Sequence, residues 1–165
     1  MHQEQVVISR KNIENLLKGK NVVAVGTTSL RTLESLYWYG VKLMEDPEAT
    51  FIISQQYPYS HKKLPTASSA LKAVAHYMDV HDKNTLTGET SIYIVPGYTF
   101  QLCAALITNF HQPASTLILL VAAFMGDDWK KVYAEALGNE YRFLSYGDSS
   151  LLIPRRPPSP EVVKR

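Results

Sequence analysis

The sequence has few of the features that mark secreted, membrane-spanning or thiolate-metal proteins. Cys103 is the only cysteine among 165 residues, so the chain cannot form an internal disulfide or a thiolate metal cluster. The longest apolar run, residues 117–125, is far shorter than the ~20 residues that a membrane helix needs. The N-terminus lacks the basic-then-apolar pattern of a signal peptide. These absences favour a soluble protein in a reducing, cytoplasmic setting.

A strong charge of one sign is also absent. The 17 Lys and Arg residues nearly balance 15 Asp and Glu residues, which gives a formal net charge of +2. That balance excludes a strongly basic nucleic-acid clamp, but it leaves room for a local basic patch. The length suffices for one domain with a substantial core.

Short apolar runs alternate with helical patterns along the chain. We expect helices from Ser9 to near Gly19, within the loop-then-helix segment 26–40 with an end near Gly40, over 67–79 with Thr66 or Ser68 as the cap, over 115–125, and over 128–138 after the N-cap Asp127. We expect strands over 21–25, 50–54, 88–95, 100–108 and in the segment 142–153. This alternation predicts one α/β domain over 1–153, with three layers and a largely parallel sheet flanked by helices. The Pro-rich, charged segment 154–165 is predicted to be a disordered tail.

The first candidate site is "GTTSLRTLES", where an apolar strand meets a helix start. Gly26, Thr27 and Thr28 would point backbone N–H groups and hydroxyls at one spot, which is typical of an anion or nucleotide site. Arg31 could add a fork for a carboxylate or phosphate. The alternative is an ordinary helix start in which Arg31 pairs with Glu34 or faces solvent. Neither the dinucleotide fingerprint nor the P-loop pattern is present.

The second candidate site is "TNFHQPAST". Asn109 and His111 lie two apart in an extended segment and are expected to point to the same side. His111 has the chemistry to transfer a proton near neutral pH, and Asn109 the chemistry to orient a purine or ribose. Ser115 or Thr116 would cap the apolar helix that follows. A satisfied turn Asn with a structural His is the alternative.

Two smaller features complete the local analysis. In "RFLSYGDSS", Tyr146 and Asp148 flank a glycine turn that either holds a ligand or closes a backbone loop. His76 and His81 are five apart on a helix and are predicted to be surface residues, so no metal site is expected.

Together these motifs resemble a known family. The segments "MHQE", "GTTSLRTLES", "PGYTF", "LITNFHQPASTLILLVAAF" and "YRFLSYGDSSLLI", in this order, resemble the S-adenosylmethionine:tRNA ribosyltransferase-isomerases of queuosine biosynthesis. The resemblance runs over residues 1–153. In that family the Met-His-x-Glu motif lies in mid-chain. The sequence therefore resembles the C-terminal part of the enzyme, without the start of the α/β domain and without the inserted β-barrel domain.

The resemblance implies a transferase that uses S-adenosylmethionine as a ribosyl donor. Its ribosyl group is transferred and isomerised onto 7-aminomethyl-7-deazaguanine in tRNA, which yields epoxyqueuosine, adenine and methionine. The implied partners are tRNA and S-adenosylmethionine, with no membrane, no metal and no resident cofactor. Because the family needs residues before Met1, the isolated chain is expected to be inactive.

Within this resemblance, the expected catalytic residues are His111, Asn109 and Asp148. The expected substrate-binding residues are His2, Glu4, Gly26, Thr27, Thr28, Arg31, Glu34, Tyr98, Ser115, Thr116 and Tyr146. For tRNA we expect Lys62 and Lys63 to meet phosphates, with Tyr57 and Tyr59 stacking on bases. The alternative is a solvated loop without a tRNA contact.

One difference from the family concerns Ala104. Many members have an acidic residue at this position, so a reaction that used that carboxylate would be impaired here. Two other function classes stay open at this point: a non-catalytic nucleotide- or RNA-binding module, and an interaction fragment of a split enzyme.

Overall fold

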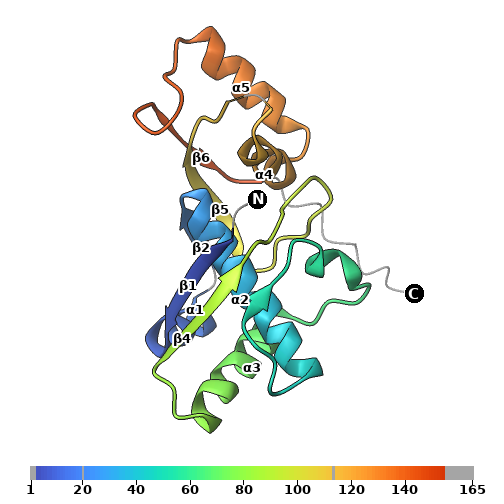
Figure 1. Ribbon diagram of the computed structural model, residues 1–165. Coiled ribbons are helices and arrows are strands. Elements are labelled where there is room, and N and C mark those ends of the chain that lie inside the picture. Colours follow the sequence, from blue (N-terminus) through green and yellow to red (C-terminus); the bar gives the residue numbers. More distant parts are fainter. Residues whose placement is uncertain (1–2, 20, 113, 155–165) are drawn as a thin grey trace, which may run out of the picture.

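In the computed structural model, residues 3–19, 21–112 and 114–154 are described. This part of the chain forms two three-stranded sheets, with strand orders β1-β4-β3 and β2-β5-β6, and five α-helices (Figure 1). The expected α/β class with flanking helices is confirmed. Residues 155–165 of the predicted tail and His2 lie outside the described residues.

The first sheet contains a strand that the sequence analysis missed. β1 (Glu4–Ser9) pairs antiparallel with β4 (Thr85–Thr90), and β4 pairs parallel with β3 (Ile52–Ile53). Along β1, Val6 and Ile8 are buried while Val7 is 63% exposed. This alternation is typical of a strand with one face on the core.

The second sheet joins distant segments. β2 (Val22–Val25) pairs parallel with β5 (Cys103–Asn109), and β6 (Ser149–Leu152) pairs antiparallel with β5. The prediction of one largely parallel sheet was therefore wrong in detail, because each sheet combines one parallel and one antiparallel pair. The apolar run of β2 had suggested burial on both faces, but only Ala24 is buried, and Val23 and Val25 are exposed.

The helices follow their local signals closely. They are α1 (Arg10–Lys18), α2 (Thr27–Glu45), α3 (Ala67–Val80), α4 (Thr116–Met125) and α5 (Asp128–Gly138), with a 3-10 turn η1 (Tyr57–Ser60). The side chains of Ser9, Thr66 and Ser115 each accept a backbone N–H at a helix start. Asp127 precedes α5 as expected, but its side chain makes no capping bond.

α2 corrects the expectation of a helix end near Gly40, because the helix continues for five more residues to Glu45. A Cβ at Gly40 would lie 2.2 Å from the carbonyl oxygen of Ala70 on α3. The glycine therefore permits a close approach of two helices and does not end one.

The strand predicted over 88–95 is also corrected. β4 ends at Thr90, and the apolar side chains of Ile92 and Ile94 are buried in the core without belonging to a strand. The Pro96-Gly97 turn is present, with Gly97 at φ 99° and a hydrogen bond of 3.0 Å from Tyr98 N to Val95 O.

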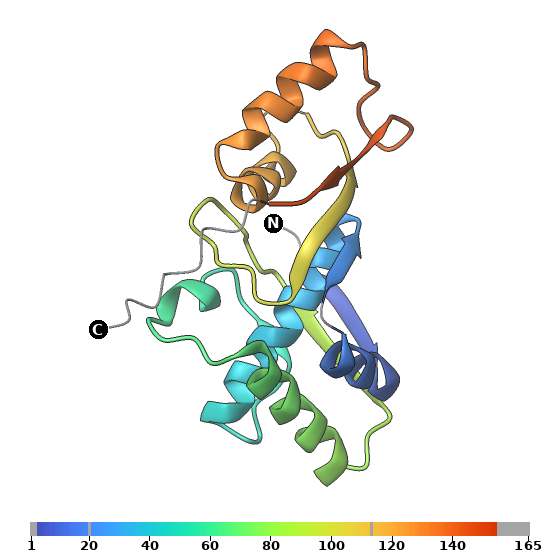
Figure 2. The same cartoon turned by 180° about the vertical axis from the view of Figure 1, so that it is seen from behind.

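The elements divide between two ends of the molecule. α4, α5 and β6 lie at one end and α3 at the other, with α2 beside both sheets between them (Figures 1 and 2). Among the residues that the structure describes, no helix is long and apolar enough to cross a membrane.

Candidate active site at the carboxyl ends of β2 and β5

The first two candidate motifs meet where the parallel strands β2 and β5 end. The N–H of Gly26, directly after β2, donates to the carbonyl oxygen of Ile107 near the end of β5 at 2.8 Å. Val25 is the register partner of Ile107. Ligands of open α/β sheets bind outside the carboxyl ends of parallel strands. We therefore take this edge as the candidate site.

The turn after β2 places the start of α2 at this edge. Gly26 adopts φ 86° and ψ 149°, a conformation reserved for glycine, and its carbonyl accepts the first helical bond from Leu30 N at 3.2 Å. The first N–H groups of a helix have no partner within the helix. Thr28, in this first turn, is exposed. The geometry suits an anionic or dipolar ligand group.

Arg31 pairs with Glu4, not with Glu34 or solvent. Arg31 is only 3% exposed, its Nη1 donates to Glu4 Oε1 at 2.6 Å, and its Nε donates to Ile92 O at 3.2 Å. Burial lowers the pKa of the guanidinium, and the Glu4 carboxylate opposes that change. Within the described residues, Arg31 Nη2 and Glu4 Oε2 are buried without a hydrogen-bond partner. One free donor and one free acceptor therefore lie in a single ion pair.

His111 sits just beyond the end of β5 and is half-buried. Its Nε2 shares a hydrogen bond of 2.9 Å with Thr108 Oγ1, and its backbone N–H donates to the Tyr133 hydroxyl at 3.0 Å. Burial lowers the pKa of the imidazole, which favours its neutral form. A neutral His held by a hydroxyl can act as a proton acceptor.

Asn109 connects β5 to the third motif. Its Nδ2 donates to Gly147 O at 3.3 Å and to Ser149 Oγ at 3.2 Å. Asp148 lies between these two residues and closes its own turn, because its Oδ2 accepts the N–H of Arg142 at 2.7 Å. That hydrogen bond is the main cause of the lowered pKa of the Asp148 carboxyl. The structure thus brings Asp148 to the site edge, with its carboxylate already bonded.

The helix α4 follows β5 along the chain and is capped at its start by Ser115. Ser115 Oγ accepts the N–H of Ile118 at 3.3 Å and donates to Gln112 O at 2.8 Å, whereas Thr116 is exposed. Five side chains of α4 are buried, namely Ile118, Leu120, Val121, Ala122 and Phe124. Such an anchored helix gives the preceding segment a rigid support.

Glu34 and Tyr98 are not brought to this edge. Glu34 is fully buried and lies at the amino end of β5, where its two oxygens accept the N–H groups of Gln101, Leu102 and Cys103, each at 3.0 Å. The Tyr98 hydroxyl adds a fourth bond of 2.9 Å to Glu34 and accepts Trp38 Nε1 at 2.8 Å. Burial raises the pKa of the Glu34 carboxyl, and the four donors oppose that rise. This network fixes the path into β5, and its assignment to substrate binding stays a prediction.

The structure also shows where the acidic residue would lie that many family members have in place of Ala104. Ala104 lies in the amino half of β5. Five residues of strand separate it from Asn109, which corresponds to about 17 Å along the strand. A carboxylate there would therefore lie away from His111.

The expected tRNA contacts lie in a different part of the molecule. Lys62 and Lys63 are exposed in the loop between η1 and α3. Tyr57 packs edge-on against Trp38, and the Tyr59 hydroxyl donates to Tyr93 O at 2.7 Å. Both tyrosines therefore have structural partners. Tyr146, by contrast, is 98% exposed.

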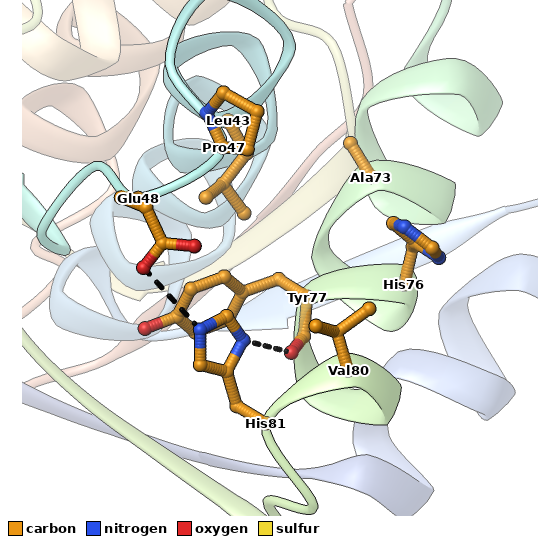
Figure 3. Close-up of a pocket in the computed structure, with 8 residues that line it drawn as sticks. All are labelled: Leu43, Pro47, Glu48, Ala73, His76, Tyr77, Val80 and His81. Atoms are coloured by element: carbon orange, nitrogen blue, oxygen red, sulfur yellow. Dashed lines mark hydrogen bonds and ion pairs between the residues drawn. The ribbon is translucent and has the colours of Figure 1, made fainter.

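A separate pocket between α2 and α3 contains both His76 and His81 among its lining residues (Figure 3). His81 Nδ1 bonds to Tyr77 O at 2.9 Å and Nε2 faces Glu48 at 3.4 Å, so both ring nitrogens are engaged. Among the described residues, no group of three His, Cys, Asp or Glu side chains is placed to hold a metal ion.

Sequence reasoning found most residues of the carboxyl edge but missed Tyr133. Its hydroxyl fixes the backbone of His111 from α5, 22 residues away. In "DWKKVYAEALG", Tyr133 lies among other apolar residues, which indicates that it is buried. Nothing in the sequence indicates that its hydroxyl bonds to His111.

Comparisons with known proteins identify relatives of this chain. A family described as queuosine biosynthesis protein matches residues 1–152. An S-adenosylmethionine:tRNA ribosyltransferase-isomerase from Methylorubrum populi is 38% identical over 96% of this chain and 34% of its own length. One from Jannaschia sp. is 47% identical over 55% of this chain and 26% of its own length.

A solved structure shows the same relationship. The S-adenosylmethionine tRNA ribosyltransferase from Thermotoga maritima matches 92% of this chain and 40% of its own chain, with a TM-score of 0.56 and 31% identity. The chain spans about a third of the length of the curated relatives it matches, and corresponds to their C-terminal part. On this evidence the chain belongs to the queuosine biosynthesis protein family.

Proposed function

We propose that this chain forms the C-terminal part of an enzyme that transfers and isomerises the ribosyl group of S-adenosylmethionine onto 7-aminomethyl-7-deazaguanine in tRNA. The products would be epoxyqueuosine in tRNA, free adenine and methionine. The observation that carries the proposal is the meeting of the family's motifs at one edge, through the bond from Gly26 N to Ile107 O. The names of the relatives supply the substrates S-adenosylmethionine and tRNA.

The Arg31–Glu4 pair fits the amino-acid end of S-adenosylmethionine. That end carries a carboxylate and an ammonium, which need a donor and an acceptor close together. Arg31 Nη2 and Glu4 Oε2 supply one of each. Both atoms are buried, so binding requires a shift of the chain near Glu4. The first turn of α2 offers further N–H groups to the carboxylate.

His111 fits the proton transfer that the reaction needs. A base must remove a proton beside the sulfonium before the ribosyl group can rearrange. Burial lowers the pKa of the His111 imidazole and so favours its neutral form, and the hydrogen bond to Thr108 fixes its ring. Asn109, held by the turn before β6, would orient the donor or the leaving adenine.

The test uses two proteins and one assay. The first protein is the isolated chain. The second, called the full-length fusion, places the N-terminal part of the Methylorubrum populi relative, up to its match with this chain, directly ahead of Met1. Each is incubated with S-adenosylmethionine and precursor-containing tRNA, and adenine and modified nucleoside are quantified. We expect products from the fusion alone.

Two outcomes would contradict the proposal. Robust multiple-turnover adenine release by the isolated chain would show that the chain does not depend on a preceding part. A folded fusion that binds S-adenosylmethionine but methylates tRNA, releasing S-adenosylhomocysteine and no adenine, would assign a different reaction.

A further inference from the structure

Tyr133 belongs to the apolar stripe of α5. Tyr133 and Ala136 are buried, and Trp129 and Val132 are partly buried against the core. These four positions follow the i, i+3, i+4, i+7 spacing of a helix face that lies on a core. α5 lies at the same end of the molecule as α4 and β6 (Figures 1 and 2). The packing of its helix therefore holds the Tyr133 side chain in place.

The ring and the hydroxyl of Tyr133 contact two consecutive residues. Its ring packs edge-on against the ring of Phe110, with centroids 5.6 Å apart, and its hydroxyl accepts the N–H of His111 at 3.0 Å. Phe143 makes a second edge-on contact, with its ring centroid 6.0 Å from that of Tyr133. These aromatic neighbours set the position of the ring. The rigid ring in turn sets the position of the hydroxyl beside His111.

The N–H of His111 takes its partner from outside the sheet. β5 ends at Asn109, so the backbone of His111 lies beyond the bonds between strands. Burial raises the pKa of the Tyr133 phenol from its ordinary value of about 10, and the bond from the His111 N–H opposes that rise. The phenol is therefore neutral near pH 7. The backbone bond from α5 and the ring bond to Thr108 together define where the imidazole lies.

We propose that Tyr133 is a positioning residue for the reaction, whose hydroxyl holds His111 in place for proton transfer by accepting its backbone N–H. The inference rests on the proposed function, in which His111 transfers the proton. Proton transfer requires the two heavy atoms to lie within hydrogen-bond reach. A displacement of about 1 Å at a reacting group can cost as much as ~10²-fold in rate. Loss of one hydroxyl on α5 therefore has a measurable effect on the rate.

The aromatic cluster offers a matched pair of substitutions. Tyr133→Phe removes the hydroxyl and keeps the ring, so the contacts with Phe110 and Phe143 remain. Tyr141→Phe is the control, because the Tyr141 ring also packs against Phe110, with centroids 5.7 Å apart. Among the residues that the structure describes, the Tyr141 hydroxyl has no hydrogen-bond partner, and the residue is 47% exposed. Each change removes one oxygen from the same cluster, but only Tyr133→Phe removes a bond to His111.

Single-turnover adenine release by the full-length fusion measures the effect. We expect Tyr133→Phe to lower the maximal rate about tenfold. The S-adenosylmethionine concentration that gives half of this rate should stay within about twofold, because the position of His111 affects the chemical step and not binding. Tyr141→Phe should leave both quantities unchanged. Urea denaturation should show that both variants are folded, since each keeps its ring.

A double variant shows whether the effect passes through His111. If Tyr133 acts only by positioning His111, Tyr133→Phe should lower the rate no further in a fusion that already carries His111→Ala. An independent role of the Tyr133 hydroxyl at the site would instead multiply the two losses. A merely structural role would likewise lower the rate in both backgrounds.

Three results would overturn the inference while the proposed function stands, with His111→Ala slow. The first is a Tyr133→Phe fusion that releases adenine at the unaltered rate, whether or not it needs more S-adenosylmethionine. The second is an equal loss of rate in Tyr133→Phe and Tyr141→Phe. The third is a multiplied loss in the double variant. A near-normal rate with His111→Ala, or no adenine from the unaltered fusion, would contradict the proposed function and this inference with it.

Discussion

Gly26 and Ile107, 81 positions apart, are joined by a backbone hydrogen bond of 2.8 Å at the point where two parallel strands end. This bond sets the start of α2 beside the segment that carries Asn109 and His111. The first turn of α2 and the polar segment that carries Asn109 and His111 thus lie at the same edge of the sheet. The proposed chemistry depends on that proximity.

The turn at Gly26 provides the first prediction. Gly26→Ala meets no steric obstacle, because a Cβ there has no atom within 4 Å, but it must adopt φ 86°. We expect the free energy of unfolding to fall by about 1–3 kcal/mol from backbone strain. Gly138→Ala is the control, since its Cβ also meets open space and its φ is not positive. Urea denaturation of both variants checks this, and equal stability of the two would contradict it.

The second prediction concerns the buried carboxylate of Glu34. Glu34→Gln keeps the volume but places an amide donor against backbone N–H groups, so two of the four donors lose their acceptor. We expect a loss of about 2–5 kcal/mol in the free energy of unfolding. Exposed Glu14→Gln should change it by less than about 0.5 kcal/mol. A Glu34→Gln protein as stable as the Glu14→Gln protein would show that this network does not hold the entry to β5.

Local signals were sufficient for several elements. Ser9 and Gly19 marked the two ends of α1, and Ser115 marked the start of α4, because capping depends on side chains within one turn. The wholly apolar run of β2 was likewise correctly assigned.

Elements determined by distant contacts were assigned less well. β1 was missed because Val7 is apolar although it is exposed, so the alternation of buried and exposed positions that pairs with β4 does not show in the sequence. Gly40 suggested a helix end, although its small size serves the contact with Ala70, 30 residues away. Ile92 and Ile94 are apolar because they fill the core, not because they lie in a strand.

The same distinction holds at the site. The three motifs could be selected individually from residue type and spacing, but their meeting depends on the pairing of β2 with β5 and of β5 with β6. For Arg31 the sequence left open a bound ligand, Glu34 or solvent, and the partner is Glu4, 27 positions earlier. The main-chain donors around Glu34 have no sequence signature.

A third prediction concerns the pH dependence of stability. Burial lowers the pKa of His111 in the folded chain, so the unfolded chain binds the proton more tightly. The stability gained from neutral His111 is therefore complete above its ordinary pKa of about 6.5, and it is lost as pH falls through the lowered value. Urea denaturation from about pH 7.5 to about pH 5, the range in which His titrates, should therefore show the free energy of unfolding fall as the pH falls. We call this dependence the pH slope.

Substitutions identify the residue responsible for the slope. His111→Gln should reduce it, because Gln does not titrate and can still bond to Thr108. Exposed His76→Gln should retain it. A slope that persists in His111→Gln would assign it to other groups.

The fourth prediction concerns tRNA. Lys62→Ala/Lys63→Ala in the full-length fusion should weaken tRNA binding and flatten the logarithmic salt dependence by about two phosphate contacts. Lys11→Ala/Lys18→Ala on α1 removes the same charge from another exposed surface and serves as the control. Binding titrations over a range of salt concentrations check this. Equal salt slopes for the two double variants would exclude a specific role for the loop after η1.

The most direct test of the reaction site is single-turnover adenine release by the full-length fusion with His111→Ala, measured beside His76→Ala. We predict that His111→Ala lowers the rate by roughly 10²–10⁴-fold, as expected for a lost general acid or base. The loss of its bond to Thr108 should reduce the free energy of unfolding by only about 0.5–1.5 kcal/mol. His76→Ala should release adenine at the unaltered rate. Near-normal adenine release by a folded His111→Ala fusion, or an equal loss in His76→Ala, would contradict a reaction centre at the carboxyl ends of β2 and β5.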